Sequence, residues 1–210
     1  MQNADAPSLG PTFSSLAEIL HSRESGLEPI PAQAKDRTHA AVALILRERK
    51  ELEVLLIKRA EAEGDPWSGQ MALPGGRRDP SDPDLLGTAV RETQEEVALS
   101  LPDWGVCLGR LEAMIPATKR LPPITIFPFV FGVTEDVSVE TSSREVDEVL
   151  WVPLSTLWAP QAASTVEIHY GDDSSRIFPC LRVRGRVIWG LTYRILTGFF
   201  ELLRAAPPLR

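Results

Sequence analysis

A glycine-rich loop followed by three closely spaced glutamates is the feature that most constrains this chain. Residues 74–76 read Pro-Gly-Gly, and Glu92, Glu95 and Glu96 follow at positions i, i+3 and i+4. In a helix this spacing predicts three carboxylates on one face, about one turn apart. Because like charges so close repel one another, we expect a cation to compensate them. Oxygen ligands suit hard ions, above all Mg²⁺, which is commonly held by a few carboxylates and substrate phosphates.

The same segment resembles the Nudix box, in which a glycine and an acidic residue precede Arg-Glu-x-x-Glu-Glu. The matching positions are Gly76, Asp82, Arg91, Glu92, Glu95, Glu96, Ala98 and Leu99. Asp82 stands where the family pattern has Glu, and the spacer from Asp82 to Arg91 is one residue longer than usual. Ala98 replaces the usual Gly and Thr93 the usual aliphatic residue. The resemblance implies an α+β fold, a Nudix-type α/β/α sandwich with a mixed sheet and the loop–helix–loop motif.

Within this family the chain is most similar to the coenzyme A pyrophosphatase branch, over roughly residues 38–204. The similar runs are residues 55–60, 69–76, 76–97 and 187–196. This resemblance implies cleavage of coenzyme A or its derivatives to 3′,5′-ADP and a phosphopantetheine. Leu73 replaces a Phe of the branch signature, Ala60 replaces a Ser, and Asp65 lies near an expected Arg. Because a lost Arg can be a lost phosphate contact, ADP-ribose, NADH, sugar nucleotides and (d)NTPs stay open as alternative substrates.

The resemblance also implies roles for individual residues. The predicted ligands of Mg²⁺ or Mn²⁺ are Glu92, Glu95, Glu96 and the carbonyl oxygen of Gly76. Arg91 is expected to pair with a neighbouring glutamate and to fix its rotamer. A further carboxylate a few positions before a Trp binds metal or acts as general base in related enzymes, and Glu145 fits that offset from Trp151 best, with Glu148 second. The predicted catalytic residues are therefore Glu92, Glu95, Glu96 and Glu145.

Several basic and aromatic side chains are candidates for binding the substrate. Guanidinium forks match phosphate oxygens, which makes Arg59, Arg77 and Arg78 candidate phosphate ligands. Trp67 either stacks on a base or caps the pocket. Further phosphate candidates in a later loop are Lys119 and Arg120.

Two non-catalytic interpretations compete with the enzyme. The acidic run alone is typical of a solvated helix face, and a Nudix domain can also be a nucleotide-binding sensor. Such sensors usually lack one carboxylate of the triplet, whereas all three are present here. The sequence therefore favours the enzyme.

Composition restricts partners and location. The chain has 210 residues, which fits one domain, and a formal charge of −7, which argues against a general binder of nucleic acid backbones. Two cysteines do not make a disulfide framework. We find no apolar run of the roughly 18–20 residues that span a bilayer and no secretory signal. We therefore expect a cytoplasmic protein that binds a small-molecule diphosphate, no nucleic acid and no membrane. Nudix domains are often dimers, so a homodimer stays open.

The order of the predicted elements supports the α+β assignment. We expect an N-terminal appendage over residues 1–37, the Nudix domain over residues 38–204 and a tail over residues 205–210. Leu16, Ile19 and Leu20 are compatible with a short amphipathic helix in the appendage. We therefore expect residues 1–37 to form a short helix or to be partly disordered. Predicted strands cover residues 40–46, 53–58, 105–115, 124–133, 146–152, 177–183 and 186–189. Predicted helices cover residues 84–97, with Asp82 or Asp84 as N-cap, 153–157 and 190–203.

Overall fold

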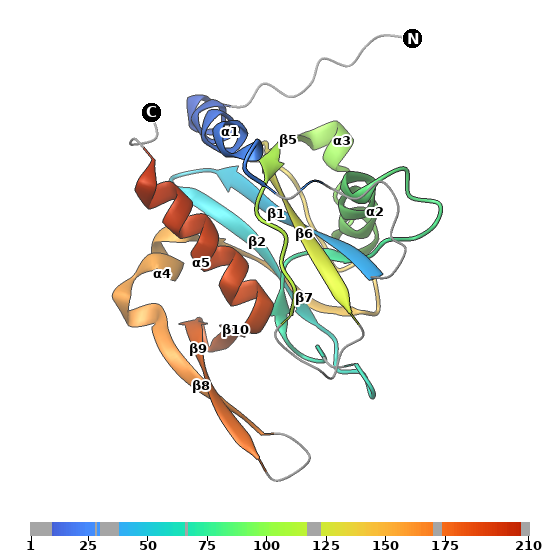
Figure 1. Cartoon of the computed structure of the whole chain (residues 1–210), viewed down its shortest axis with the longest axis vertical. Coiled ribbons are helices and arrows are strands. Elements are labelled where there is room, and N and C mark those ends of the chain that lie inside the picture. Colours follow the sequence, from blue (N-terminus) through green and yellow to red (C-terminus); the bar gives the residue numbers. More distant parts are fainter. Residues whose placement is uncertain are drawn as a thin grey trace.

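A mixed sheet lies between two layers of helices in the computed structural model, which describes residues 10–27, 29, 38–65, 67–116, 123–169 and 174–206 (Figure 1). The strands of this sheet are β1 (Thr38–Glu48), β2 (Leu52–Arg59), β3 (Met71–Ala72), β4 (Gly75–Arg77), β5 (Gly105–Arg110), β6 (Ile124–Val133) and β7 (Val146–Pro153). The helices are α1 (Pro11–Glu24), α2 (Leu85–Val97), α3 (Leu101–Trp104), α4 (Leu154–Trp158), the 3₁₀ turn η1 (Pro160–Ala162) and α5 (Gly190–Ala205). A second, antiparallel sheet contains β8 (Ala163–His169), β9 (Ser175–Val183) and β10 (Arg186–Trp189), and β8 and β9 extend away from the body.

Strands β1 and β2 form a hairpin, and the segment that contains β3 and β4 is inserted between them. The two strands pair only near their turn, where Leu46 lies opposite Val54. Beyond it β4 pairs with β1, with Ala40 opposite Arg77, and β3 pairs with β2. The outer edge of β1 pairs in parallel with β6, and that of β2 pairs with β7. The glycine-rich segment that the sequence placed in a loop is therefore an inserted strand at the centre of the sheet.

Each face of the sheet buries a separate apolar core. Because strand side chains alternate between faces, Ala41, Ala43 and Ile45 of β1 pack on the side of α2, and Leu44 and Leu46 pack on the side of α1 and α5. All five side chains are fully buried. These two cores confirm the predicted sandwich.

Helix α1 contributes to the core beside α5. Phe13, Leu16 and Leu20 are buried, and Leu20 lies so close to β5 that a Cβ on Gly109 would stand 2.8 Å from its own Cβ. The helix predicted around Leu16 is present and is longer than expected. The division into appendage, domain and tail stays a prediction, and the packing of α1 argues that this part of residues 1–37 belongs with the domain.

Local capping interactions define both ends of helix α2. Asp84 is the N-cap, and its carboxylate accepts a hydrogen bond from the N–H of Gly87 at 2.7 Å, which decides between the two predicted caps. Ala98, with φ of 55°, ends the helix in the left-handed conformation. None of the helices in the described residues is long and apolar enough to cross a membrane.

One predicted strand was too long, and one strand of the structure was not predicted. The strand expected over residues 105–115 ends at Arg110, because Gly109 has φ of 145° and the register with β6 shifts there. Only Met114 pairs again, with Ile126. Strand β8 was not predicted, since its residues alternate between exposed and half-buried positions and none of them is fully buried.

Candidate active site

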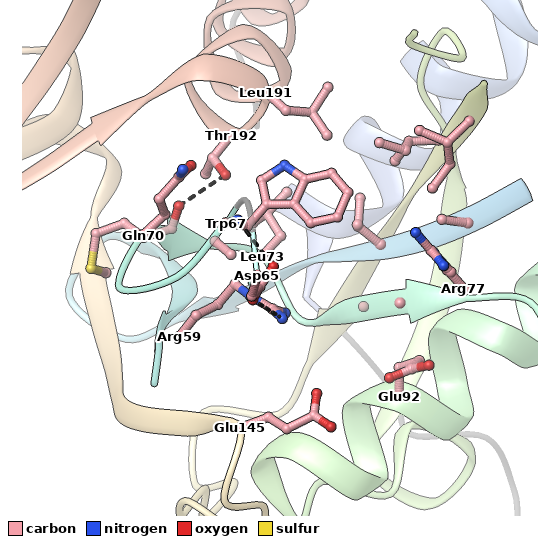
Figure 2. Close-up of a pocket in the computed structure, with 18 of the residues that line it drawn as sticks. Arg59, Asp65, Trp67, Gln70, Leu73, Arg77, Glu92, Glu145, Leu191 and Thr192 are labelled. Carbon is pink, nitrogen blue, oxygen red and sulfur yellow. Dashed lines mark hydrogen bonds and ion pairs between the residues drawn. The ribbon is translucent and has the colours of Figure 1, made fainter. Parts of the chain in front are cut away.

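A cavity of about 540 Å³ opens where the inserted strand meets α2, β1, β6 and the start of α5 (Figure 2). Its polar lining combines carboxylates, arginines and glycine backbone, from Arg59, Asp65, Gly75, Gly76, Arg77, Glu92 and Glu145. Its apolar lining comes from strand and helix ends, with Ala40, Val42, Leu73, Ile124, Ile126, Leu191 and Ile195, and with Trp67 at the loop. One end of the cavity, the charged end, holds the carboxylates of Glu92 and Glu145, and the end on the other side of β4 is mainly apolar, with the guanidinium of Arg77 beside Trp67 and Leu191 (Figure 2).

Glu96 is the most deeply buried carboxylate of the site, with 3% of its surface exposed. One carboxylate oxygen, Oε2, accepts a hydrogen bond from the N–H of Gly75 at 2.9 Å, and the other, Oε1, lies 4.0 Å from Nη1 of Arg59. Burial, together with the nearby charges of Glu92 and Glu145, raises the pKa of Glu96 to about 8 against these two contacts. The ionised form of Glu96 is therefore destabilised in the metal-free site, and a cation beside its carboxylate would stabilise that form.

Glu92 occupies the space that a side chain at position 76 would need. A Cβ on Gly76 would lie 2.4 Å from Oε1 of Glu92, so only glycine lets this carboxylate reach the backbone of β4. Burial raises the pKa of Glu92, and the hydrogen bond from Arg91 opposes the shift.

Glu95 points away from the cavity. Its side chain is 56% exposed, it is absent from the cavity lining, and its Oε2 accepts a hydrogen bond from Nη1 of Arg91 at 3.0 Å. The same nitrogen donates to Oε1 of Glu92 at 2.9 Å. Arg91 therefore joins Glu95 to Glu92, in line with the rotamer-fixing role expected of it.

Asp82 is the residue that holds Arg91 in place, a role not predicted from the sequence, where Asp82 was only a candidate N-cap and the acidic position of the Nudix box. Its buried carboxylate accepts hydrogen bonds from Nε and Nη2 of Arg91 at 2.8 and 3.0 Å, and from the hydroxyl of Thr88 and the N–H of Asp79, each at 2.9 Å. The hydrogen bonds from Arg91 lower the pKa of Asp82 to about 2. The signal available in sequence was its place at the acidic position of the Nudix box.

Asp82→Asn is expected to lower the free energy of unfolding at pH 7 by about 2 kcal/mol, because the native pKa lies roughly two units below the ordinary value. A lowered carboxyl pKa stabilises the fold above the ordinary pKa and loses that effect as pH falls towards the native one. The difference from wild type should therefore shrink between about pH 4 and pH 2. Urea denaturation across pH checks this, with the exposed Asp136→Asn as control; a difference that persists at pH 2 would contradict it.

Of the two candidate bases, only Glu145 lines the cavity. It reaches the charged end from the loop before β7, on the same side of β4 as Glu92 (Figure 2). Its carbonyl accepts a hydrogen bond from the N–H of Ala60 at 2.8 Å, which ties the loop to the end of β2. Glu148 instead accepts a hydrogen bond from Nε of Arg186 at 2.8 Å, in an ion pair outside the cavity lining.

Arg59 lines the cavity but already has a carboxylate partner. Its Nη2 donates to Asp65 at 2.9 Å, and Asp65 also accepts the N–H of Trp67 at 3.0 Å. Burial would raise the pKa of Asp65, but these two partners outweigh it and lower the pKa. Asp65 therefore links Arg59 to the loop that carries Trp67.

The other predicted substrate ligands differ in position. Arg77 and Trp67 line the cavity. Arg78 does not line it, and its Nη2 lies 3.4 Å from the carbonyl oxygens of Asp82 and Pro83. Lys119 and Arg120 fall outside the described residues.

The donors at the charged end fit a hard divalent ion. Glu92, Glu96 and the carbonyl of Gly76 offer oxygen atoms, and a cation would relieve the repulsion between the half-buried carboxylate of Glu92 and the buried carboxylate of Glu96. Among the described residues, no three His, Cys, Asp or Glu side chains come close enough together to hold an ion by themselves. Mg²⁺ is usually held by one or two carboxylates, with waters and substrate phosphates completing its coordination.

A sandwich with a Gly-Gly strand inserted in its sheet, facing the glutamates of the following helix, defines a Nudix hydrolase fold and site. The family model of the NUDIX domain matches residues 36–170, more than half of the chain. The chain therefore belongs to the Nudix hydrolase family, whose members act on pyrophosphate bonds.

Individual relatives agree with this assignment. The mitochondrial coenzyme A diphosphatase NUDT8 of Homo sapiens is 33% identical over 137 residues, 64% of this chain and 56% of that protein, so the chain spans just over half of this relative. A protein named Uncharacterized Nudix hydrolase NudL, from Photorhabdus laumondii, is 31% identical over 188 residues, 87% of this chain and 94% of that one. The crystal structure of a MutT/nudix family protein from Enterococcus faecalis superposes with a TM-score of 0.56 at 18% identity, over 90% of this chain and 70% of that one, and supports the fold.

Proposed function

We propose that this chain is a Mg²⁺- or Mn²⁺-dependent pyrophosphatase that hydrolyses the diphosphate linkage of coenzyme A or its derivatives, giving 3′,5′-ADP and a phosphopantetheine. The observation that carries the proposal is that Glu92 and Glu145 line one end of a cavity, with Glu96 buried against the N–H of Gly75 beside them, while the other end is mainly apolar. The similarity to a coenzyme A diphosphatase supports the choice of substrate.

The residues of the charged end divide the work of diphosphate hydrolysis. Glu92, Glu96 and the carbonyl of Gly76 would hold the ion, which would lower the pKa of a bound water and neutralise phosphoryl oxygens. Glu145, which lines the cavity from a separate loop, is the proposed general base for the attacking water. Arg91 orients Glu92, and Glu95 acts through Arg91. Much of the catalysis is then positioning and electrostatics.

A panel of substrates tests this function. Coenzyme A, acetyl-coenzyme A, ADP-ribose, NADH, a sugar nucleotide and a nucleoside triphosphate are each incubated with Mg²⁺, Mn²⁺ or a chelator in ¹⁸O-labelled water. Mass spectrometry should find 3′,5′-ADP and phosphopantetheine from coenzyme A only when metal is present, and the label shows which phosphorus is attacked. Cleavage of the other substrates alone would reject coenzyme A and keep the pyrophosphatase, whereas tight binding without product would favour a sensor.

One observation favours a second substrate class. Asp65 stands near the position of an expected Arg and pairs with Arg59 at 2.9 Å, so the cavity has less free positive charge than the branch signature implies. Substrates with no phosphate beyond the diphosphate, such as ADP-ribose or NADH, are the alternative that this pairing favours. The cytoplasmic location and the homodimer stay predictions from sequence.

The metal-free protein is expected to lose thermal stability as pH rises from about 5 to about 8. Glu96 has its pKa raised from 4.5 to about 8 by burial, so in this window the native state holds a proton that the unfolded state has released. Stability must then fall with rising pH. Excess Mg²⁺ should offset the repulsion of the ionised site, and an ion at about 100 times its Kd adds roughly 2.7 kcal/mol.

Thermal denaturation with chelator and with Mg²⁺, at pH 5, 6.5 and 8, measures this effect. The gain in Tm on adding Mg²⁺ should grow with pH. An equal gain at pH 5 and pH 8, or none at either, would contradict a metal site built on Glu96.

A further inference from the structure

The two ends of the cavity lie on opposite sides of β4. Figure 2 shows Glu92 and Glu145 on one side of this strand, and Arg77, Trp67 and Leu191 on the other. The strand register supports this arrangement, because directly opposite residues of an antiparallel pair point to the same face. Gly76 lies opposite Ala41, whose side chain packs on the side of α2.

Arg77 shares the apolar face. It lies opposite Ala40 in the register, and Ala40 forms a small apolar cluster with Ile124 and Ile126 that lines the cavity. The guanidinium of Arg77 therefore stands at the end of the cavity that has a Trp and aliphatic side chains, and away from the carboxylates that would hold the ion.

The charge of Arg77 is available to a ligand, unlike that of Arg59. Arg59 pairs with Asp65 at 2.9 Å and faces Glu96 at 4.0 Å. Within the described part of the chain, Arg77 is exposed and its side chain makes no hydrogen bond or ion pair. A cation beside an apolar surface indicates an anionic group on the ligand, and a guanidinium matches a phosphate by a forked pair of hydrogen bonds.

We propose that Arg77 binds a phosphomonoester on the ribose of the substrate's nucleotide half, separate from the diphosphate that is cleaved. The scissile diphosphate belongs beside Glu92 and Glu96, on the other side of β4. Trp67 offers an aromatic face for a base on the same side as Arg77. A nucleotide at the apolar end of the cavity would thus place its base on Trp67 and its ribose phosphate on Arg77.

The inference rests on the proposed function and refines its substrate class. Coenzyme A carries such a phosphate at the ribose 3′ position, and NADPH carries one at the 2′ position, whereas dephospho-coenzyme A and NADH lack it. Arg77 then makes the enzyme selective for the phosphorylated member of each pair.

Binding of nucleotide fragments tests the role of Arg77 without turnover. Calorimetry should show that the wild type binds 3′,5′-ADP or 2′,5′-ADP roughly 10- to 100-fold more tightly than 5′-AMP. Arg77→Gln should remove this preference by weakening only the bisphosphate, and Arg77→Lys should keep part of it, since lysine retains the charge without the fork. The exposed Arg176→Gln, on β9, is the control and should keep the full preference.

Kinetics on the matched substrate pairs separate the two proposals. Arg77→Gln should raise KM for coenzyme A or NADPH about as much as it weakens the bisphosphate, and leave dephospho-coenzyme A and NADH unchanged. Equal affinity of the wild type for 5′-AMP and both bisphosphates would overturn the role of Arg77, as would an equal loss on both members of each pair. A preference for bisphosphates without any cleavage of coenzyme A would reject the proposed substrate and keep the role of Arg77.

Discussion

Glu96→Gln is expected to lower kcat by about 10³-fold or more, because a metal ion contributes several kcal/mol to stabilising the transition state and Glu96 is one of its proposed ligands. The same change should raise the Tm of the metal-free protein at pH 8. Glu96 is only 3% exposed, and glutamine removes a buried charge while its oxygen can still accept the hydrogen bond from Gly75. Steady-state kinetics with Mg²⁺ and thermal denaturation with chelator measure the two effects.

A loss of kcat together with a gain in Tm would distinguish a metal ligand from a residue that only supports the fold. Glu201→Gln, on an exposed position of α5, controls for the loss of one negative charge and should leave both quantities near wild type. Glu95→Gln should reduce kcat by only about tenfold, since Glu95 acts through Arg91 in a supporting position. Metal-dependent turnover within tenfold of wild type in Glu96→Gln would remove Glu96 from the ligand set, and a lower Tm would show that its main role is in folding.

The glutamate triplet shows how far the sequence could predict the site. The helix, its N-cap position and its inward face all follow from local pattern, and α2 occupies residues close to those expected. The prediction that all three carboxylates share one face was too coarse. Glu95 and Glu96 are consecutive, so their side chains point about 100° apart around a helix of 3.6 residues per turn. Of these two, Glu96 is buried and Glu95 is exposed.

Ion pairs between a loop and the helix or strand next to it could not be predicted from the sequence. Asp82 and Arg91 form their ion pair because the loop before α2 folds back along the helix, and Arg59 meets Asp65 because the end of β2 and the following loop converge. Neither partner can be chosen from spacing alone. Strands β3 and β4 are two and three residues long, too short for an alternating pattern, so the segment resembled a loop. Its insertion becomes visible only from its pairing with β1 and β2.

Gly75→Ala is expected to lower the free energy of unfolding by about 3 kcal/mol or more. Gly75 has φ of 152°, a conformation that L-residues rarely adopt, and a Cβ there would lie 2.3 Å from the carbonyl oxygen of Ala41 and 2.6 Å from Cα of Val42. Both are backbone atoms of β1, so neither can rotate away, and β4 would have to separate from the centre of the sheet. Urea denaturation at pH 7 measures the loss.

Substitutions at two other glycines separate the effect of backbone strain from the effect of a steric clash. Gly185 also has positive φ, 76°, but nothing lies within 4 Å of its added Cβ, so Gly185→Ala should cost only about 1 kcal/mol of backbone strain. At Gly76 the added Cβ would meet the movable carboxylate of Glu92 at 2.4 Å. Gly76→Ala should therefore stay folded while losing activity and the gain in Tm on adding Mg²⁺. If Gly75→Ala lost no more stability than Gly185→Ala, the inserted strand would not be held at the centre of the sheet by close backbone contact.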